Sequence, residues 1–428
     1  MAITLFGTLG LMLLLNVPIS ISLGIAAIIA LTTGTMNTNI VIIAQRLFTS
    51  LDSFPLMAVP FFILSGDLME KGGISKRLIE FARVLLGRLP SSLSIITTIA
   101  SAFFGAISGS NAATVAAIGG IMIPNMEKAG YPKDRAAAVA ASSGTLGVVI
   151  PPSISMVTYA IIANVSIGTM FMAGFVPGLM LASVIILVAI ITCGKYEIKQ
   201  NENLTVDKFL RSFIDAIWAL LMPIIILGGI YGGIFTPTEA SAVAVVYSFI
   251  VAMFVYKELK WRDLPAILSK SASSTAAILF VVCLSAPFSW LMTSANIPTT
   301  IAGAVLNAFS SKYIILFLVN FVLLFLGCFL ETQSIILLIT PMLLPLVTGL
   351  GVHPVALGII MVINTSIGMI TPPMAVNLFV ASGIAKISIG DISKRIMPFL
   401  LSEIAVLLLI TYFPDIITWL PKITGLMN

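Results

Sequence analysis

Long runs of apolar residues, separated by short polar segments, constrain the fold of this chain more than any other feature. The run over residues 168–193, for example, contains no charged side chain. Of the 428 residues, 59% are hydrophobic and only 9% are charged, whereas a soluble domain carries roughly 25% charged residues. So few charges cannot cover a water-soluble surface, and backbone groups in lipid need partners within their own segment. The pattern therefore predicts an all-α polytopic membrane protein.

The apolar runs are long enough for helices that cross a bilayer. One crossing needs about 20 residues, so the runs allow about ten crossings plus re-entrant pieces. They cover residues 3–33, 54–70, 91–126, 136–163, 168–193, 213–235, 238–256, 272–296, 313–347, 354–385 and 396–420. The first run is ambiguous, since Asn16-Val17-Pro18 can break it into two short helices. Two stretches with Lys and Arg, at about 74–89 and 257–271, are amphipathic and are expected to lie along the membrane surface.

The positions of the cations predict which runs turn back within the membrane. Cytoplasmic loops are enriched in Lys and Arg, which also accounts for the net charge of +5 without a nucleic-acid groove. The run 91–126 has seven cations at its flanks: Lys76, Arg77, Arg83, Arg88, Lys128, Lys133 and Arg135. Both of its ends should therefore face the cytoplasm, so we expect a hairpin that turns at Ser108-Gly109-Ser110-Asn111. The run 313–347 has only Lys312 and His353 at its flanks and is expected to enter from the other side.

The chain also repeats itself at an offset of 221 residues. The pair Pro151-Pro152 matches Pro372-Pro373, and Gly130 matches Gly351. Because the flanking charges differ, we expect two inverted repeats, each with a re-entrant helical hairpin and a broken helix, as in secondary transporters. A duplication that serves structure alone, as in some channels, is the alternative. The expected units are 1–54 (N-terminal scaffold helices), 55–193 (first repeat), 194–275 (connector with two scaffold helices), 276–413 (second repeat) and 414–428 (C-terminal end).

Each repeat has one polar hairpin tip and one interrupted helix. The interruptions are Ser143 to Ser153 and Asn364 to Pro373. Consecutive prolines remove amide donors and free carbonyls, which must find other partners inside a membrane. Freed carbonyls and Ser, Thr and Asn oxygens suit sodium, and the N-termini of half-helices suit an anionic solute. We therefore expect two pseudo-symmetric sodium sites that flank one solute site. The alternatives are a kinked helix at the prolines and hydroxyls that bond to their own helix.

Glu331 lies between two apolar stretches at the second hairpin tip. A carboxylate inside a membrane is costly and is a functional candidate by default. It could bind a cation, order the tip or contact a solute hydroxyl. The alternative is a charge that stabilises the start of the following helix.

Three segments carry a family resemblance over nearly the whole chain. They are Gly228-Gly229-Ile230-Tyr231-Gly232-Gly233-Ile234-Phe235-Thr236-Pro237-Thr238-Glu239-Ala240, Gly144-Thr145-Leu146-Gly147 leading into Pro151-Pro152-Ser153, and Lys128-Ala129-Gly130-Tyr131-Pro132. In the first segment, Thr236 and Glu239 form a capping box with Pro237 at the first helical position, and the glycines permit close helix approach. Together the segments resemble the large membrane subunit of tripartite ATP-independent periplasmic (TRAP) transporters, the DctM family.

This resemblance implies a multi-pass protein of the bacterial inner membrane that imports organic acids, driven by sodium. It implies an elevator-type machine with a scaffold domain and a transport domain that holds both hairpins. The implied partners are a small four-helix membrane subunit and a periplasmic solute-binding protein, besides the solute and the lipid bilayer. Two sodium ions and no organic cofactor are expected.

Carried over residue by residue, the resemblance also implies positions for ions and solute. The first sodium site would use Ser108, Ser110, Asn111, Gly144, Thr145 and Gly147. The second would use Thr332, Asn364, Thr365, Gly368 and Met369. The solute would lie near Ser110, Pro152, Ser153, Glu331, Thr371 and Pro373. Members that import sialic acid use a basic residue where Ser294-Ala295-Asn296 stands here, so a C4-dicarboxylate or another small organic anion is favoured over sialic acid.

Other function classes fit the sequence less well. A single histidine, His353, cannot build a metalloprotease motif, and there is no GxxxxGK[ST] phosphate loop for ATP. We therefore expect no enzyme. A channel, and a two-component sodium/carboxylate carrier that works without a binding protein, stay open as alternatives.

Overall fold

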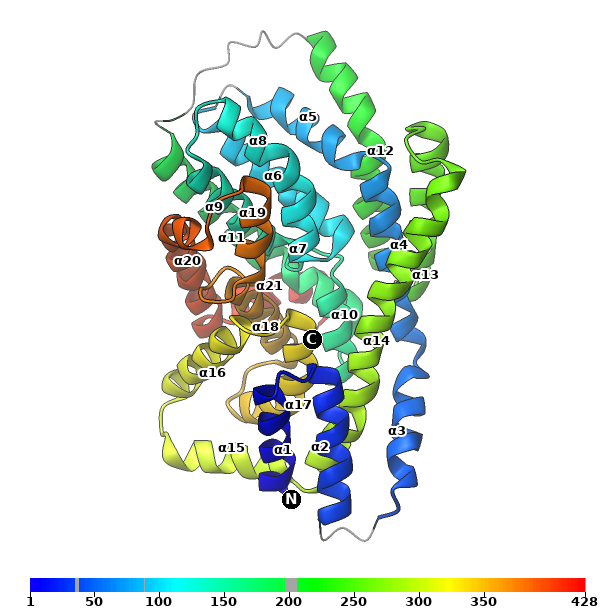
Figure 1. Ribbon diagram of the computed structural model, residues 1–428, viewed down its shortest axis with the longest axis vertical. Coiled ribbons are helices and arrows are strands. Elements are labelled where there is room, and N and C mark those ends of the chain that lie inside the picture. Colours follow the sequence, from blue (N-terminus) through cyan, green and yellow to red (C-terminus); the bar gives the residue numbers. More distant parts are fainter. Residues whose placement is uncertain (35–37, 88, 195, 197–205, 428) are drawn as a thin grey trace.

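The computed structural model describes residues 1–34, 38–87, 89–194, 196 and 206–427 (Figure 1). Every regular element in these residues is helical, which confirms the all-α fold. Six of the described helices are long and apolar enough to span a membrane, or seven if the bent pair Val41–Leu51 and Phe54–Lys71 is one span. This is fewer than the about ten crossings expected from apolar length. The difference arises because several apolar runs are divided into helices of 10–17 residues.

The N-terminal run is two helices, which resolves its ambiguity. The first elements are α1 (Ala2–Leu14), α2 (Ile19–Thr33), α3 (Val41–Leu51), η1 (Phe54–Met57), α4 (Ala58–Lys71) and α5 (Ile74–Leu86). Asn16 takes a left-handed φ of 61° between α1 and α2, and Pro18 caps α2. Leu5, Leu23 and Phe288 share one buried cluster, so these helices pack against α14.

The middle of the chain forms long helices. They are α11 (Ile167–Cys193), α12 (Val206–Tyr231), α13 (Pro237–Ile250) continuing as η4 (Val251–Val255), the short η5 (Trp261–Asp263) and α14 (Leu264–Ser294). The prediction of a separate surface helix at 257–271 is wrong, because most of this stretch belongs to α14, which continues from Leu264 to Ser294 as one helix. The charge of Lys270 does not need the membrane surface, since its ammonium pairs with carboxylates of α4.

The capping box after the glycine-rich segment is confirmed. Glu239 Oε2 accepts from the Thr236 amide at 2.8 Å, and the Glu239 amide donates to Thr236 Oγ1 at 3.3 Å. Within the described residues, these glycines make no close contact with another helix. Gly233 takes a left-handed φ of 67°, and a Cβ on Gly229 would lie 2.4 Å from the Phe235 ring. These glycines therefore shape the turn between α12 and α13.

Both hairpins and both interruptions are present. The first half comprises α6 (Ser92–Ser108), α7 (Asn111–Thr114), η2 (Val115–Gly119), α8 (Gly120–Lys128), α9 (Lys133–Ser143), η3 (Gly144–Gly147) and α10 (Ile154–Ala163). The second comprises α15 (Ile297–Ala308), α16 (Lys312–Gly327), α17 (Thr332–Gly349), α18 (Pro354–Gly368), α19 (Val376–Ala385), α20 (Ile389–Tyr412) and α21 (Asp415–Ile423). The helical ladder is thus opened at each Pro-Pro pair, as the sequence predicted.

The two halves repeat each other in backbone detail. Both Pro151–Pro152 and Pro372–Pro373 are cis, and Gly130 and Gly351 have left-handed φ values of 94° and 73°. The short helices α5 and α15 lie at opposite ends of the long axis of the molecule (Figure 1).

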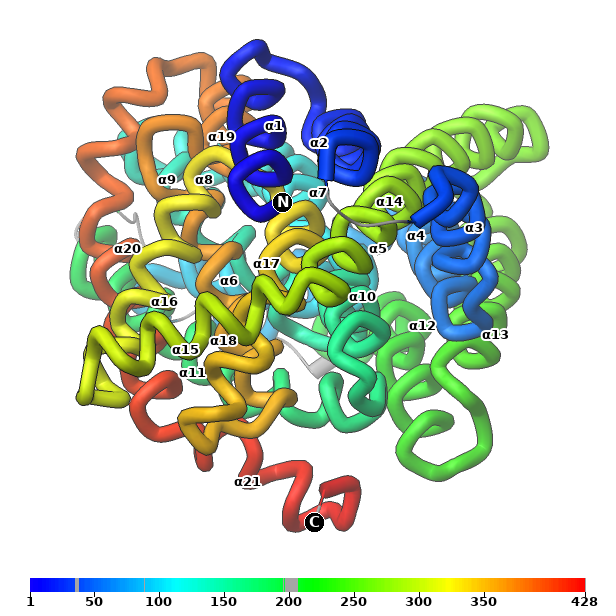
Figure 2. Tube along the Cα trace, turned by 90° about the horizontal axis from the view of Figure 1, so that it is seen from below, coloured from blue at the N-terminus to red at the C-terminus, as the bar shows by residue number. Residues whose placement is uncertain are grey.

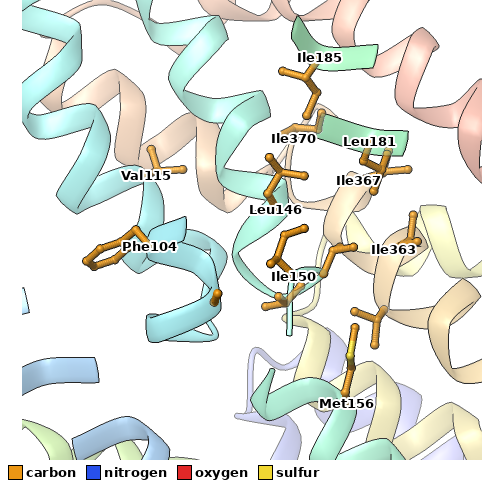
Figure 3. Packing of buried hydrophobic residues seen from close by; sticks show 14 of the residues in the cluster. Phe104, Val115, Leu146, Ile150, Met156, Leu181, Ile185, Ile363, Ile367 and Ile370 are labelled. Atoms are coloured by element: carbon orange, nitrogen blue, oxygen red, sulfur yellow. The ribbon is translucent and has the colours of Figure 1, made fainter. Parts of the chain in front are cut away.

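The first interruption is enclosed by the main hydrophobic core. Leu146 and Ile150 of the interruption lie beside Leu181 of α11 and Ile363 of α18, all buried (Figure 3). Viewed along the long axis, α3, α4, α12, α13 and α14 gather on one side of the molecule, and α9, α16 and α20 lie on the other (Figure 2). The first interruption is therefore packed within the core, and the central cavity lies where α4 and α14 meet the hairpins.

Candidate functional site

Four half-helices begin at one central cavity of about 470 Å³. Their starts are contributed by α7, α10, α17 and α19, and the lining includes Ser110, Asn111, Ile154, Ser155, Thr332 and Val376. The first amides of a helix lack partners within the helix and carry partial positive charge. The cavity is therefore surrounded by four sources of positive potential that come from backbone alone.

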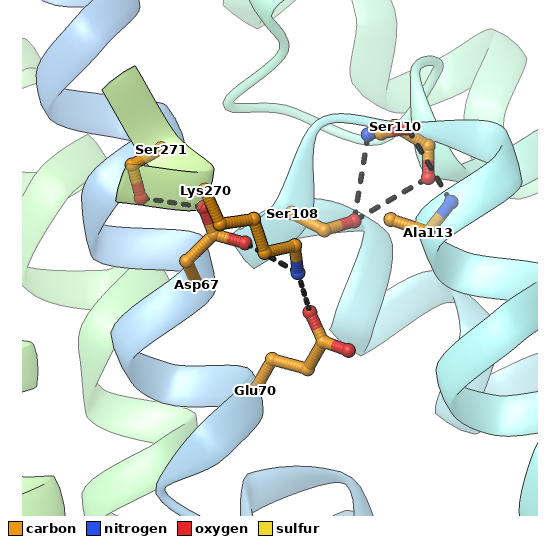
Figure 4. Close-up of polar contacts among 7 residues, drawn as sticks. All are labelled: Asp67, Glu70, Ser108, Ser110, Ala113, Lys270 and Ser271. Carbon is orange, nitrogen blue, oxygen red and sulfur yellow. Dashed lines mark hydrogen bonds and ion pairs between the residues drawn. The ribbon is translucent and has the colours of Figure 1, made fainter. Parts of the chain in front are cut away.

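The charged side chains that line the cavity carry a net negative charge, opposite in sign to the helix starts. Among the described residues that line it, the carboxylates are Asp67, Glu70 and Glu331, and Lys270 is the one cation. Lys270 Nζ lies 2.8 Å from Asp67 Oδ1 and 3.0 Å from Glu70 Oε2 (Figure 4). Glu331 is the N-cap residue of α17, but its side chain makes no capping hydrogen bond and is exposed in the cavity. The carboxyl group of Glu331 is thus free to meet a ligand.

The first hairpin tip is tied to both interruptions. Asn111 Oδ1 accepts from the Val148 amide at 3.0 Å, and Asn111 Nδ2 donates to Ser366 Oγ at 2.7 Å. Ser366 Oγ in turn donates to the Thr145 carbonyl at 2.7 Å. These four residues are all buried. The chain of bonds holds the tip, the first interruption and the second interruption in one arrangement.

Glycines let the tips touch the interruptions. A Cβ on Gly147 would lie 2.5 Å from the Ser110 carbonyl oxygen, and one on Gly105 would lie 2.8 Å from the Gly147 Cα. The second half has the same contact, since a Cβ on Gly368 would lie 2.5 Å from the Gly327 Cα. Contact of two backbones at this distance admits only hydrogen in place of a side chain.

The structure brings together all residues expected at the first sodium site. Ser108 Oγ lies 3.2 Å from Thr114 Oγ1, and a Cβ on Gly144 would lie 3.4 Å from the Asn111 carbonyl oxygen. The Thr145 hydroxyl donates to the Ser142 carbonyl at 2.7 Å, so it serves its own helix. The other oxygens gathered here belong to the backbone of the tip and the interruption and to the hydroxyls of Ser108 and Ser110, which bond within the tip.

The residues expected at the second sodium site are only partly brought together. Thr332 Oγ1 lies 3.7 Å from Met369 Sδ, which places the second tip against the second interruption. The Thr365 hydroxyl instead donates to the Met361 carbonyl at 2.8 Å. Asn364 Nδ2 donates to Asn320 Oδ1 at 2.8 Å, so this amide is turned towards α16.

Within the described ranges, three buried amide oxygens of the site lack a hydrogen-bond partner. Asn364 Oδ1, Asn377 Oδ1 and Gln333 Oε1 are buried and have no hydrogen-bond partner among the described residues. The described part of the chain holds no group of three or more His, Cys, Asp or Glu side chains that could bind a metal ion. Neutral amide, hydroxyl and carbonyl oxygens are ligands for hard cations, and a monovalent ion needs the least charge from its ligands.

Only some of the residues expected to bind the solute line the central cavity. Ser110 and Glu331 line the cavity, whereas Pro152, Ser153, Thr371 and Pro373 are not among its lining residues. Ser153 caps α10, where its Oγ accepts from the Met156 amide at 3.5 Å, and Thr371 donates to the Ile367 carbonyl at 2.8 Å. The residues just after the prolines reach the cavity instead, because the half-helices begin there.

Several polar residues of the site were not predicted as ligands of an ion or the solute. They include Asp67, Glu70, Ser155, Lys270 and Ser274, together with Gln333 of the second tip and Ser366 of the second interruption. Gln333 Nε2 donates to Ser155 Oγ at 3.2 Å, which joins the second tip to the helix after the first interruption. Ser366 had a signal in the sequence, since it lies 221 residues after Thr145 and thus at the offset of the repeat.

Comparison with known proteins places the chain among transporters. Residues 6–416 match the family model described as the DctM component of the tripartite ATP-independent periplasmic transporter. The chain is 40% identical to the C4-dicarboxylate TRAP transporter large permease protein DctM of Rhodobacter capsulatus, over 99% of this chain and 100% of the relative. It is 44% identical to the isethionate TRAP transporter permease protein DctMQ of Oleidesulfovibrio alaskensis, over 96% of this chain and 65% of that longer relative.

A solved structure supports the fold. The YdaH transporter of Alcanivorax borkumensis superimposes with a TM-score of 0.64 over 95% of this chain and 97% of that chain, at 15% sequence identity. At this identity the likeness concerns the fold alone.

Proposed function

This chain belongs to the DctM family of tripartite ATP-independent periplasmic transporters, and from that premise we propose that it imports small organic anions together with sodium. As a member of a transporter family, the chain is not an enzyme. The observation that carries the proposal is the central cavity, at which four half-helices begin and which three carboxylates line.

The charge balance of the cavity favours coupling to a cation. Three carboxylates and one lysine repel an anion unless positive charge is added. Sodium ions bound at the tips and interruptions supply that charge, and the unpartnered buried oxygens of Asn364 and Asn377 support such binding. The anion and the ions then bind best together, which is what symport requires.

The size of the solute follows from the relatives and the cavity. Relatives at 40% and 44% identity carry names of C4-dicarboxylate and isethionate permeases. Both compounds are small anions, and the backbone amides at the four helix starts suit carboxylate or sulfonate oxygens. We therefore favour a C4-dicarboxylate or isethionate over sialic acid, for which the basic residue before α15 is missing at Ser294-Ala295-Asn296.

The proposal includes an elevator movement in the bacterial inner membrane. The helical hairpins and broken helices would move as one body against α4, α13 and α14. The opposite ends taken by α5 and α15 support an inverted orientation of the two repeats (Figure 1). A small membrane subunit and a periplasmic solute-binding protein would complete the importer, as in the family in general.

Uptake in proteoliposomes tests this function. The purified chain with its small subunit would be reconstituted, and the solute-binding protein added with labelled succinate or isethionate. We expect accumulation above the outside concentration with an inward sodium gradient and none with choline in its place. Accumulation that ignores sodium would contradict the coupling, and equilibration without accumulation would indicate a channel. Uptake without the binding protein would favour the two-component carrier.

A thermal-shift screen of the cognate binding protein against organic acids identifies the solute itself. A ligand raises the unfolding temperature of the protein that binds it. We expect C4-dicarboxylates or isethionate to give the largest shift. A shift for sialic acid alone would contradict our choice of solute.

A further inference from the structure

Lys270 stands apart from the hairpins and interruptions that form the rest of the cavity. It belongs to neither hairpin and lies near the start of α14. Its side chain extends between α4 and the first hairpin tip (Figure 4). Its side chain is 58% exposed although it pairs with both Asp67 and Glu70. An ammonium group on a flexible stem can therefore keep one partner and still turn to a ligand.

The two carboxylates beside Lys270 are not equivalent. The Asp67 side chain is only 12% exposed, and it also accepts from Ser271 Oγ at 2.5 Å. The Glu70 side chain is 36% exposed and has Lys270 as its ion-pair partner. Asp67 thus contacts two residues of α14, Lys270 and Ser271. Glu70 adds a second negative charge that competes for the same ammonium group.

Lys270 also lies where two cavities meet. It lines the central cavity and a neighbouring cavity of about 270 Å³, whose lining includes Asp67, Glu70, Lys71 and Asp263. Asp67, Glu70 and Lys270 line both cavities, so an anion in either cavity lies near the Lys270 side chain. The helix starts around the central cavity carry only partial positive charge. Among the described residues that line this cavity, Lys270 is the one with a full positive charge.

We propose that Lys270 binds an acidic group of the solute inside the central cavity and that Glu70 competes with the solute for it. This inference rests on the proposed import of small organic anions. It adds a specificity-determining residue on α14, outside both hairpins and both interruptions. It also predicts that neutralising Lys270 weakens anion binding whereas neutralising Glu70 strengthens it. An ion pair that only joins two helices would not give these opposite effects.

Binding of succinate and isethionate to the purified permease in sodium, measured as the thermal shift of the protein, tests the proposal. We expect Lys270→Gln to raise the half-saturating concentration about tenfold, since it removes a charged contact with the anion. Lys270→Arg keeps the charge and should stay within about threefold of the wild type. Glu70→Gln should lower the half-saturating concentration about two- to threefold, because it frees the ammonium group. Lys394→Gln, an exposed lysine of α20 outside both cavities, should change nothing.

The outcomes separate this proposal from the function on which it rests. Equal half-saturating concentrations in Lys270→Gln and the wild type would overturn the role of Lys270 and leave the import function intact. Weaker binding in both Lys270→Gln and Glu70→Gln would also overturn it, in favour of an ion pair that only joins α4 to α14. If Lys270→Gln does not fold, the sign of the Glu70→Gln effect decides. No binding and no uptake of either anion by the wild type would overturn both proposals.

Discussion

Ser366 Oγ donates to the Thr145 carbonyl at 2.7 Å, and these two residues are 221 positions apart, the offset at which the sequence repeats. Equivalent positions of the two halves therefore meet in a direct hydrogen bond. Because Ser366 also accepts from Asn111 Nδ2, this one hydroxyl joins both interruptions to the first hairpin tip. The relationship makes Ser366 a positioning residue for the whole cavity.

Replacing Ser366 with Ala should weaken the permease in both stability and sodium binding. The change leaves a buried carbonyl and a buried amide without this partner, at a cost of about 1–3 kcal/mol. The sodium concentration that gives half of the thermal shift should rise. Ser183→Ala is the control, since that hydroxyl is exposed and bonds only to its own helix at Leu179. Equal loss in the two variants would contradict the role of Ser366.

Replacing Gly147 with Ala should separate the first tip from the first interruption. The new Cβ would lie 2.5 Å from a backbone oxygen of Ser110, which cannot move aside like a side chain. Overpacking of this kind costs about 1–3 kcal/mol, so the unfolding temperature and uptake should both fall. Gly120→Ala, where nothing lies within 4 Å, should fold and transport normally. Normal uptake by the Gly147 variant would show that close contact is not needed.

Asn111 and Thr365 should differ in their effect on sodium binding. Asn111→Ala removes the bonds to the Val148 amide and to Ser366, so sodium should bind about tenfold more weakly. Thr365→Val removes a hydroxyl that already bonds to the Met361 carbonyl, so sodium binding should change little. The sodium-dependent thermal shift measures both. A strong loss in Thr365→Val with none in Asn111→Ala would contradict the assigned first site.

The inverted orientation of the repeats predicts labelling from opposite membrane faces. Lys128 and Gly349 occupy equivalent positions at the ends of the two hairpins, and both are exposed. Each would be replaced by Cys in a chain without Cys193, Cys283 and Cys328. A membrane-impermeant thiol reagent should then reach one from the cytoplasmic face and the other from the periplasmic face. Labelling of both from one face would contradict the inversion.

The sequence predicted the parts of the fold that depend on local chemistry. The apolar runs, the turn at Gly109-Ser110 and the interruptions at both Pro-Pro pairs are where they were expected. The prediction of a surface helix at 257–271 was wrong. Amphipathicity does not reveal the carboxylates of α4, distant in sequence, that pair with Lys270 in the structure. Contacts between elements far apart in sequence decide such cases.

The candidate site was predictable only in its outline. Tips and interruptions were found because polar residues and prolines stand out in apolar runs. The cavity-lining role of Lys270, and the bond from Gln333 to Ser155, depend on how separate helices pack, which one sequence does not specify. Ser366 could have been found by comparing the two halves, since its equivalent Thr145 was already a candidate.

The mutual dependence of sodium and solute binding tests the central claim most directly. The claim is that the helix starts hold the anion while oxygens of the tips and interruptions hold sodium beside it, so each should strengthen the binding of the other by the same factor. Succinate or isethionate binding to the purified permease would be measured in sodium and in potassium, and sodium binding with and without the anion. We predict that the anion binds at least tenfold more tightly in sodium, with a matching gain for sodium. Equal anion affinity in sodium and potassium would contradict the account.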